Sequence, residues 1–277
     1  MIRETLALTK RELLRLARNP QAIATSLLLP ILYLLLFGQA LNFGALYGSN
    51  NAAAFIPVVR GAPNYFSYFA AGMAGFVAVT ATLFIGANVI FDKLFGILKR
   101  ISSTPASSTS IFGARLLAGL IQPIGLAFLV LGLAWGLGHL GLSGLSITAS
   151  VGVVAAVQVV LAIVILSAMF ASLFLAIGFA IEQPQTYFAV VNAINLPVLL
   201  TSAALYPWGI LPGWFKTVAS YNPITLAVEV IRLDLFAAAP SYYPYNAWVY
   251  LAGLFGWAVA MILIAILLAR RALGPRH

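Results

Sequence analysis

The side chains that could do chemistry are few in this sequence, and they do not gather. There is no cysteine, which excludes thiolate nucleophiles and thiolate metal sites. His139 and His277 are far apart, and no nucleotide-binding G-x-x-x-x-G-K-[ST] loop is present. Acid–base and metal chemistry need clustered groups, but the carboxylates are scattered: Glu4, Glu12, Asp92, Glu182, Glu229 and Asp234. We therefore expect no catalytic residues, metal or cofactor in this chain.

One pair of opposite charges stands in an otherwise apolar segment. Glu229 and Arg232 are three residues apart, so on a helix they lie on one face and can pair. Charges near hydrocarbon are costly unless they are satisfied. Two interpretations stay open: a structural pair that fixes its helix, or a polar gate or substrate contact.

The composition indicates whether these residues are surrounded by water or by lipid. The 277 residues are 62% hydrophobic and 8% charged, whereas a soluble domain carries about 25% charged residues. We expect a membrane protein through most of its length. The net charge of +9 is then explained by contact with anionic lipid on the cytoplasmic side and not by nucleic acid. Ion-coupled carriers need intramembrane charges, which are nearly missing here, so any transport would take its energy from another polypeptide.

Six apolar stretches are long enough, or nearly so, to cross a bilayer as helices. The first follows a basic head and contains no charge, and we interpret it as a retained span and not a signal peptide. The fourth exceeds one crossing, so it should tilt or protrude. We predict an all-α membrane protein with a single domain over residues 1–277 and spans at 22–41, 65–90, 111–137, 147–181, 186–205 and 246–269.

Lys and Arg set the expected orientation. With the N-terminus in the cytoplasm, all fifteen basic residues except Arg60, Lys216 and Arg232 fall on the cytoplasmic side. We therefore expect a multi-pass protein of the cell (inner) membrane with both termini in the cytoplasm.

The first predicted surface helix covers residues 1–18. Its polar face carries Arg11, Arg15 and Arg18, opposite an apolar face that can lie along the membrane. The segment could be a simple topology anchor or an element that docks a partner.

The second predicted surface helix covers residues 91–105. Phe91, Leu94, Phe95 and Leu98 have helical spacing, with Asp92 near the start and Lys99 and Arg100 near the end, as the helix dipole favours. Its apolar face must pack on lipid, on the rest of the chain or on a partner protein. We favour the partner.

Residues 206–245 form the third non-spanning region. They are rich in Pro, Trp and Tyr, and we expect re-entrant or interfacial helices, one of them starting at Pro223. Polar residues inside the spans are sparse, and they either bond neighbouring helices or line a weakly polar pathway. The pathway candidates are Thr80, Asn88, Asn192, Asn195 and Ser202. Gly132 and Gly136 match G-x-x-x-G, which is weak evidence of helix pairing.

Two segments carry a family resemblance. Residues 195–233 close a span, turn through Pro and start a short helix with Asn222-Pro223 and a trailing Arg232; residues 96–105 end in Thr104-Pro105. In both, the chain resembles the type-2 permeases of ABC exporters, which include daunorubicin-type drug exporters and polysaccharide exporters.

The resemblance implies roles and partners. Residues 1–18 would be an interface helix, residues 92–103 a coupling helix docked into a cytoplasmic ABC ATPase, and the turn at Glu182 a smaller contact. Two permeases, expected to be a homodimer, would join two ATPase subunits that bind ATP and Mg. The cargo would be an amphipathic drug or a lipid-linked molecule; a polysaccharide or glycolipid exporter is the alternative, and a secondary carrier or a membrane enzyme is less favoured.

Overall fold

The computed structural model describes residues 28, 30–38, 55–97, 108–140 and 144–273. Its regular elements in these ranges are all helices, which confirms the all-α prediction. Most of the predicted first span lies outside the described residues, although 30–38 are helical. The predicted interface helix with Arg11, Arg15 and Arg18 lies outside them too, as do Leu98, Lys99 and Arg100.

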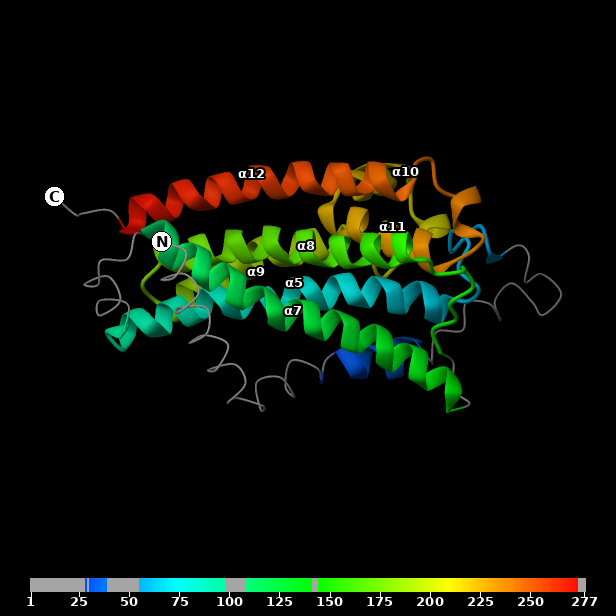
Figure 1. Ribbon diagram of the computed structural model, residues 1–277, viewed down its shortest axis with the longest axis horizontal. Helices are drawn as coiled ribbons and strands as arrows, with labels where there is room; N and C mark the ends of the chain where they lie inside the picture. The colour runs from blue at the N-terminus through cyan, green and yellow to red at the C-terminus, as the bar shows by residue number, and fades with distance from the viewer. Residues whose placement is uncertain (1–27, 29, 39–54, 98–107, 141–143, 274–277) are drawn as a thin grey trace.

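Four long helices run along the length of the molecule, with a shorter one beside them and two short ones at one end (Figure 1). In chain order the elements are α5 (Tyr65–Leu94), α7 (Ser108–His139), α8 (Val153–Ala180), α9 (Pro184–Leu200), η1 (Trp208–Ile210), α10 (Gly213–Tyr221), α11 (Pro223–Leu235), η2 (Ala239–Ser241) and α12 (Ala247–Leu273).

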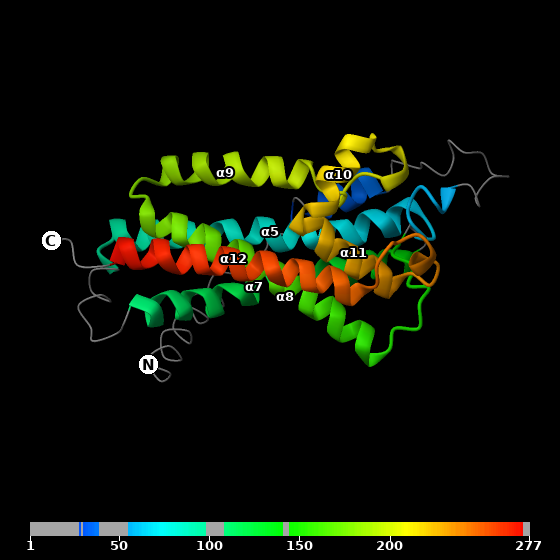
Figure 2. The ribbon, with the colours of Figure 1, turned by 90° about the horizontal axis from the view of Figure 1, so that it is seen from above.

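Helix α8 is the centre of the bundle. It packs most extensively against α12 and α5, and α5 also packs along α7. Helix α9 lies to one side and contacts mainly α5 and α8 (Figure 2). The backbones of α5 and α8 come into direct contact, because a Cβ on Gly86 would lie 2.1 Å from the Phe174 carbonyl oxygen. Glycine therefore lets α5 and α8 touch.

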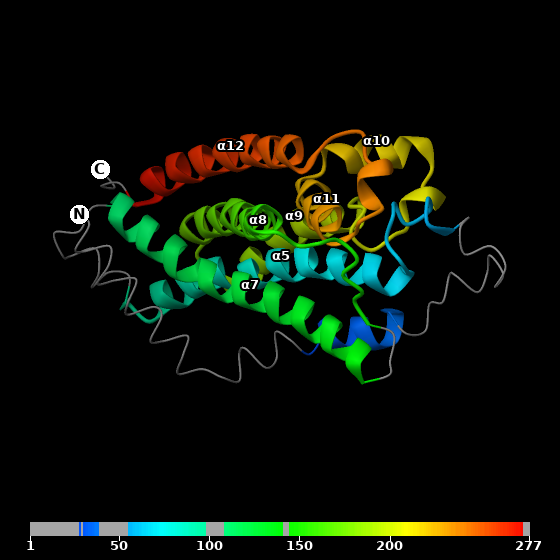
Figure 3. The ribbon, with the colours of Figure 1, turned by 45° about the vertical axis from the view of Figure 1, so that its right-hand side comes forward.

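The bundle has two distinct ends. At one, α5 and α8 end while α7 and α9 begin, and we call it the Lys93 end. At the other, α10 and α11 gather beside the start of α12, and we call it the α11 end (Figures 1 and 3). Chain direction alternates between the two ends, as expected of successive crossings. The short helix α11 packs against α5, α8 and α12.

Four of the described helices are long and apolar enough to cross a membrane: Tyr65–Leu94, Ile111–His139, Val153–Ala180 and Ala247–Leu268. They fall where the second, third, fourth and sixth spans are predicted. The fourth span was predicted too long, because residues 147–152 are not helical. Thr148 and Ala149 instead donate their N–H groups to the Leu235 carbonyl, which ties this segment to the end of α11.

The predicted fifth span differs in length. Helix α9 has 17 residues and ends at Leu200, which gives about 25 Å of helix against a hydrocarbon core of about 30 Å. Thr201 closes the helix by donating its N–H to the Pro197 carbonyl, and the chain then turns. The six-span layout stays a prediction.

Candidate functional site

Helix α11 starts on a capping residue that also holds α9. The Asn222 side chain accepts the Ile224 N–H (2.9 Å) and donates to the Val198 carbonyl (2.7 Å) and to Thr201 Oγ1 (3.1 Å). Pro223 is the first helical residue, where its missing N–H costs nothing. The Asn-Pro start predicted from the sequence is therefore present, and it joins the end of α9 to the start of α11.

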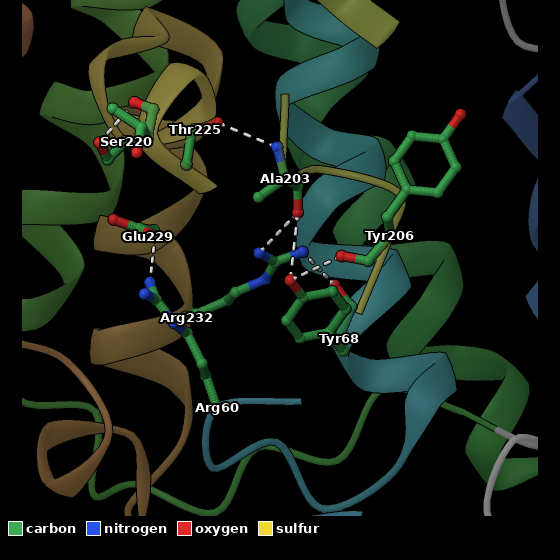
Figure 4. Close-up of polar contacts among 9 residues, drawn as sticks. Arg60, Tyr68, Ala203, Tyr206, Ser220, Thr225, Glu229 and Arg232 are labelled. Carbon is green, nitrogen blue, oxygen red and sulfur yellow. Dashed lines mark hydrogen bonds and ion pairs between the residues drawn. The ribbon is translucent and has the colours of Figure 1, made fainter. Parts of the chain in front are cut away.

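The predicted pair between Glu229 and Arg232 is wrong. Glu229 forms its ion pair with Arg60, and both side chains are buried (Figure 4). Arg232 donates instead to the carbonyls of Ala203 (3.0 Å), Ala204 (2.9 Å) and Tyr68 (3.0 Å). The Ala203 and Ala204 carbonyls lie in the turn after α9, where they lack intrahelical partners, and the guanidinium satisfies them. Spacing along one helix does not reveal these off-helix partners.

The turn after α9 is held from three sides. The Ala203 N–H donates to Thr225 Oγ1 on α11 at 3.0 Å, and its carbonyl also accepts the Tyr68 hydroxyl at 3.2 Å. The Arg232 guanidinium carbon lies 3.4 Å from the centre of the Tyr68 ring. Figure 4 shows α11, the turn and α5 joined through these side chains. Arg232 therefore links α11 to α5 and to the turn after α9.

Arg60 is a functional candidate that sequence analysis placed outside the cytoplasm without giving it a role. Its guanidinium carbon lies 3.5 Å from the centre of the Trp208 ring and 4.6 Å from that of Tyr243. Its backbone is left-handed, with φ of 50°, a conformation rarely adopted by a non-glycine residue. A signal existed in the sequence: on the side of the membrane predicted for Arg60, the acidic residues are Glu229 and Asp234, so an ion pair with one of them could have been predicted.

A smaller polar cluster links α11, α8 and α12. With the Gln158 amide oriented to satisfy both neighbours, its nitrogen donates to Asp234 Oδ1 (3.0 Å) and its oxygen accepts the Trp248 indole N–H (3.0 Å). Asp234 Oδ2 has no hydrogen-bond partner in the described structure. Burial raises the pKa of Asp234 to about 7.

At the Lys93 end, Asp92 does not face outward, as direct contact with a docked partner would require. Its side chain is fully buried, and Arg115 of α7 donates to its Oδ2 at 2.7 Å. Residues 91–94 are the last turn of α5 and not the start of a separate helix. Helix α5 ends at Leu94 and is capped by Phe95, before Gly96 adopts a φ of 70°. Its 30 residues extend about 45 Å, longer than a bilayer core, so a protruding last turn is expected.

Lys93 is a further candidate that the sequence analysis did not single out. Its Nζ donates to the carbonyls of Gly178 (3.0 Å), Phe179 (2.6 Å) and Ile181 (2.8 Å). These carbonyls end α8, where a cation satisfies orphan acceptors and complements the helix dipole. The residues on either side point outward: Phe91, Leu94 and Phe95 are 37%, 59% and 73% exposed. Glu182, in the turn between α8 and α9, is also exposed.

The five pathway candidates have different surroundings in the structure. Thr80 bonds to the Phe76 carbonyl of its own helix, and Ser202 bonds to the Leu199 carbonyl. Asn195 is buried, and its side-chain oxygen lacks a partner in the described structure. Asn88 and Asn192 are exposed. Within the described residues, no group of three or more His, Asp and Glu could hold a metal.

Long apolar helices joined by buried charges at both ends define a multi-pass membrane protein. Residues 3–236 match the family model of the ABC-2 type transporter, and the chain belongs to that family. Its members are membrane subunits that work with an ABC ATPase and are not themselves enzymes.

Named relatives agree with this assignment. The chain is 28% identical to a putative transport permease, ycf38, of Cyanophora paradoxa over 92% of its own length and 79% of the relative's. It is 30% identical to the Pyropia yezoensis ycf38 permease over 84% and 74%. It is also 24% identical to the probable doxorubicin resistance ABC transporter permease protein DrrC of Mycobacterium tuberculosis, over 83% and 76%.

Proposed function

We propose that this chain is the membrane subunit of an ATP-driven exporter in the cell (inner) membrane, with both termini in the cytoplasm. The observation that carries the proposal is the family match over residues 3–236. The cargo is an amphipathic drug-like or lipid-linked molecule. Support for this cargo comes from the relative named for doxorubicin resistance and from the apolar spans.

A separate ABC ATPase supplies the energy in this proposal. ATP and Mg bind to that subunit, since the present sequence has no phosphate-binding loop. Two ATPase copies serve two permeases, which form a homodimer. The subunit number follows from the resemblance to type-2 exporters.

The ATPase docks at the Lys93 end. Phe91, Leu94 and Phe95 form an exposed apolar surface on the last turn of α5, which we call the α5 lip. Exposed large apolar side chains beyond a membrane span need a cover, and an ATPase surface at the cytoplasmic face would supply one. Lys99 and Arg100 follow the lip in sequence, and Glu182 adds a contact from the α8–α9 turn.

The α11 end is the outer gate of the proposed pathway. Arg60 and Glu229 join the segment before α5 to α11, and Arg232 joins α11 to the turn after α9. These ties close the outer side of the bundle in the resting state. Export then needs α11 to separate from at least one of these partners.

The cargo and direction can be tested in inside-out vesicles from cells that make this chain with its ATPase. We expect ATP-dependent accumulation of doxorubicin, a fluorescent amphipathic amine, inside such vesicles. Accumulation of a lipid-linked oligosaccharide, with no movement of the amine, would instead favour the polysaccharide alternative. The polysaccharide alternative is supported by exposed aromatic rings at the α11 end, such as Trp214 and Trp248, because aromatic rings stack on sugars.

A further inference from the structure

Two consecutive residues of α5 turn inward and tie its end to three other elements. Asp92 pairs with Arg115 of α7. Lys93 donates to three carbonyls at the end of α8 and in the turn that leads to α9. The charges within the last turn of α5 are thus used inside the bundle, whereas Phe91, Leu94 and Phe95 around them face outward.

Close to these Lys93 bonds, α5 and α8 also contact each other through their backbones, which stiffens the Lys93 end. A Cβ on Gly178 would lie 2.5 Å from the Gly86 carbonyl oxygen, so α5 and α8 touch without intervening side chains. The Tyr187 hydroxyl of α9 donates to the Leu83 carbonyl of α5 at 2.6 Å. Packed interiors of this kind deform little. Four helices therefore meet at the Lys93 end through charge, backbone contact and a buried hydroxyl.

We propose that Asp92 and Lys93 are coupling residues: they make the ends of α5, α7 and α8, with the start of α9, one rigid unit that transmits motion of the α5 lip. This inference rests on the proposed docking of an ATPase at the lip. A lip on a loosely held helix end would bend when the ATPase moved, and the displacement would be lost. A lip joined to three other helices passes the displacement on to the bundle.

The two residues have positioning roles and do not touch the ATPase in this proposal. Asp92 is fully buried, and each of the three Lys93 bonds is internal to the chain. Substituting them should leave docking and ATP hydrolysis in place but reduce the transport achieved per ATP. A purely structural role would instead lower folding, hydrolysis and transport together.

The test uses the complex purified through a tag on this chain and reconstituted in proteoliposomes. ATP hydrolysis and doxorubicin transport are measured in the same sample. For Lys93→Met we expect hydrolysis within about twofold of the unchanged complex and transport per ATP lowered about tenfold. Lys93→Arg keeps a cation near the same carbonyls and should restore at least half of the lost coupling. Lys216→Met makes the same change on α10, at the α11 end, and should leave the transport per ATP unchanged.

The buried pair gives a second, independent arm. Asp92→Asn and Arg115→Gln each leave one buried charge without its partner, whereas the double variant removes both. We expect the double variant to lose less coupling than the two single losses combined. The proposal is overturned if Lys93→Met keeps the normal transport per ATP, or if protein yield, hydrolysis and transport fall in proportion in every variant.

Failure of this inference can be told apart from failure of the proposed function. If the unchanged complex moves doxorubicin with ATP and Lys93→Met does so equally well, only the coupling role is lost. If the unchanged complex shows no ATP-dependent transport of doxorubicin or of a lipid-linked oligosaccharide, the proposed function itself is contradicted, and the coupling role falls with it.

Discussion

At the scale of single residues, the buried charges decide how the α11 end is held. Arg60 and Glu229 come from segments 169 positions apart, and each would be costly to bury without the other. Arg232 has a different task, because its acceptors are main-chain carbonyls. Only the three-dimensional structure distinguishes these two kinds of partner.

The Arg60–Glu229 pair makes a prediction about stability. Arg60→Ala or Glu229→Ala leaves a buried charge unpaired, which should cost about 3–5 kcal/mol. The double variant should lose clearly less than the sum of the two, by at least about 1 kcal/mol. Unfolding in detergent, followed by tryptophan fluorescence, measures this. Glu229→Ala with Arg232→Ala is the control and should be closer to additive; strict additivity for Arg60 and Glu229 would contradict the pair.

Asp234 gives a prediction about pH. Its pKa is raised to about 7 in the folded chain, above the value of about 3.9 for an unfolded chain. The folded state therefore holds a proton that the unfolded state has released between these values, so stability falls as pH rises from about 4 to about 7. Asp234→Asn should be more stable than the unchanged chain at pH 8, and the gap should close toward pH 4. A gap in melting temperature that stays constant over this range would contradict the assignment.

At the scale of elements, glycine determines how closely α5 and α8 pack. On α7, Gly132 and Gly136 match the G-x-x-x-G pattern, yet a Cβ at either would meet nothing within 4 Å. Gly86 and Gly178 belong to no such motif, and they make the contact. The sequence pattern alone does not show which glycines make the contact. Glycine is required only where the backbone of another helix approaches closely.

A pair of alanine substitutions tests this contact. Gly86→Ala places a methyl group 2.1 Å from the Phe174 carbonyl oxygen and 2.4 Å from the Tyr187 hydroxyl. It should destabilise the protein by roughly 1–3 kcal/mol or more. Gly132→Ala occupies open space and should be neutral or stabilising by up to about 1 kcal/mol, since alanine favours helix. Equal melting temperatures for the two variants would refute a backbone contact between α5 and α8.

At the scale of the whole molecule, the lengths of the apolar stretches predicted most of the helices. The positions of the charged residues predicted few of the side-chain contacts. Four helices long and apolar enough to cross a membrane lie where hydropathy placed spans, because a bilayer requires long apolar helices. The start of α8 was misplaced, because residues 147–152 are not helical and Thr148 and Ala149 bond to the Leu235 carbonyl of α11. Asp92 was assigned to the coupling helix, and Glu229 was recognised as an unusual charge in an apolar segment. Their partners Arg115 and Arg60 lie on other elements, and spacing along one helix does not predict such contacts.

The central claim is that this chain is a conduit driven by a separate ATPase. The most direct measurement is doxorubicin transport into proteoliposomes that contain the chain alone, or the chain with its ATPase subunit, each with and without ATP. We expect transport against a gradient only when the ATPase and ATP are both present. Uphill transport by the chain alone, driven by an ion gradient and indifferent to ATP, would contradict the account.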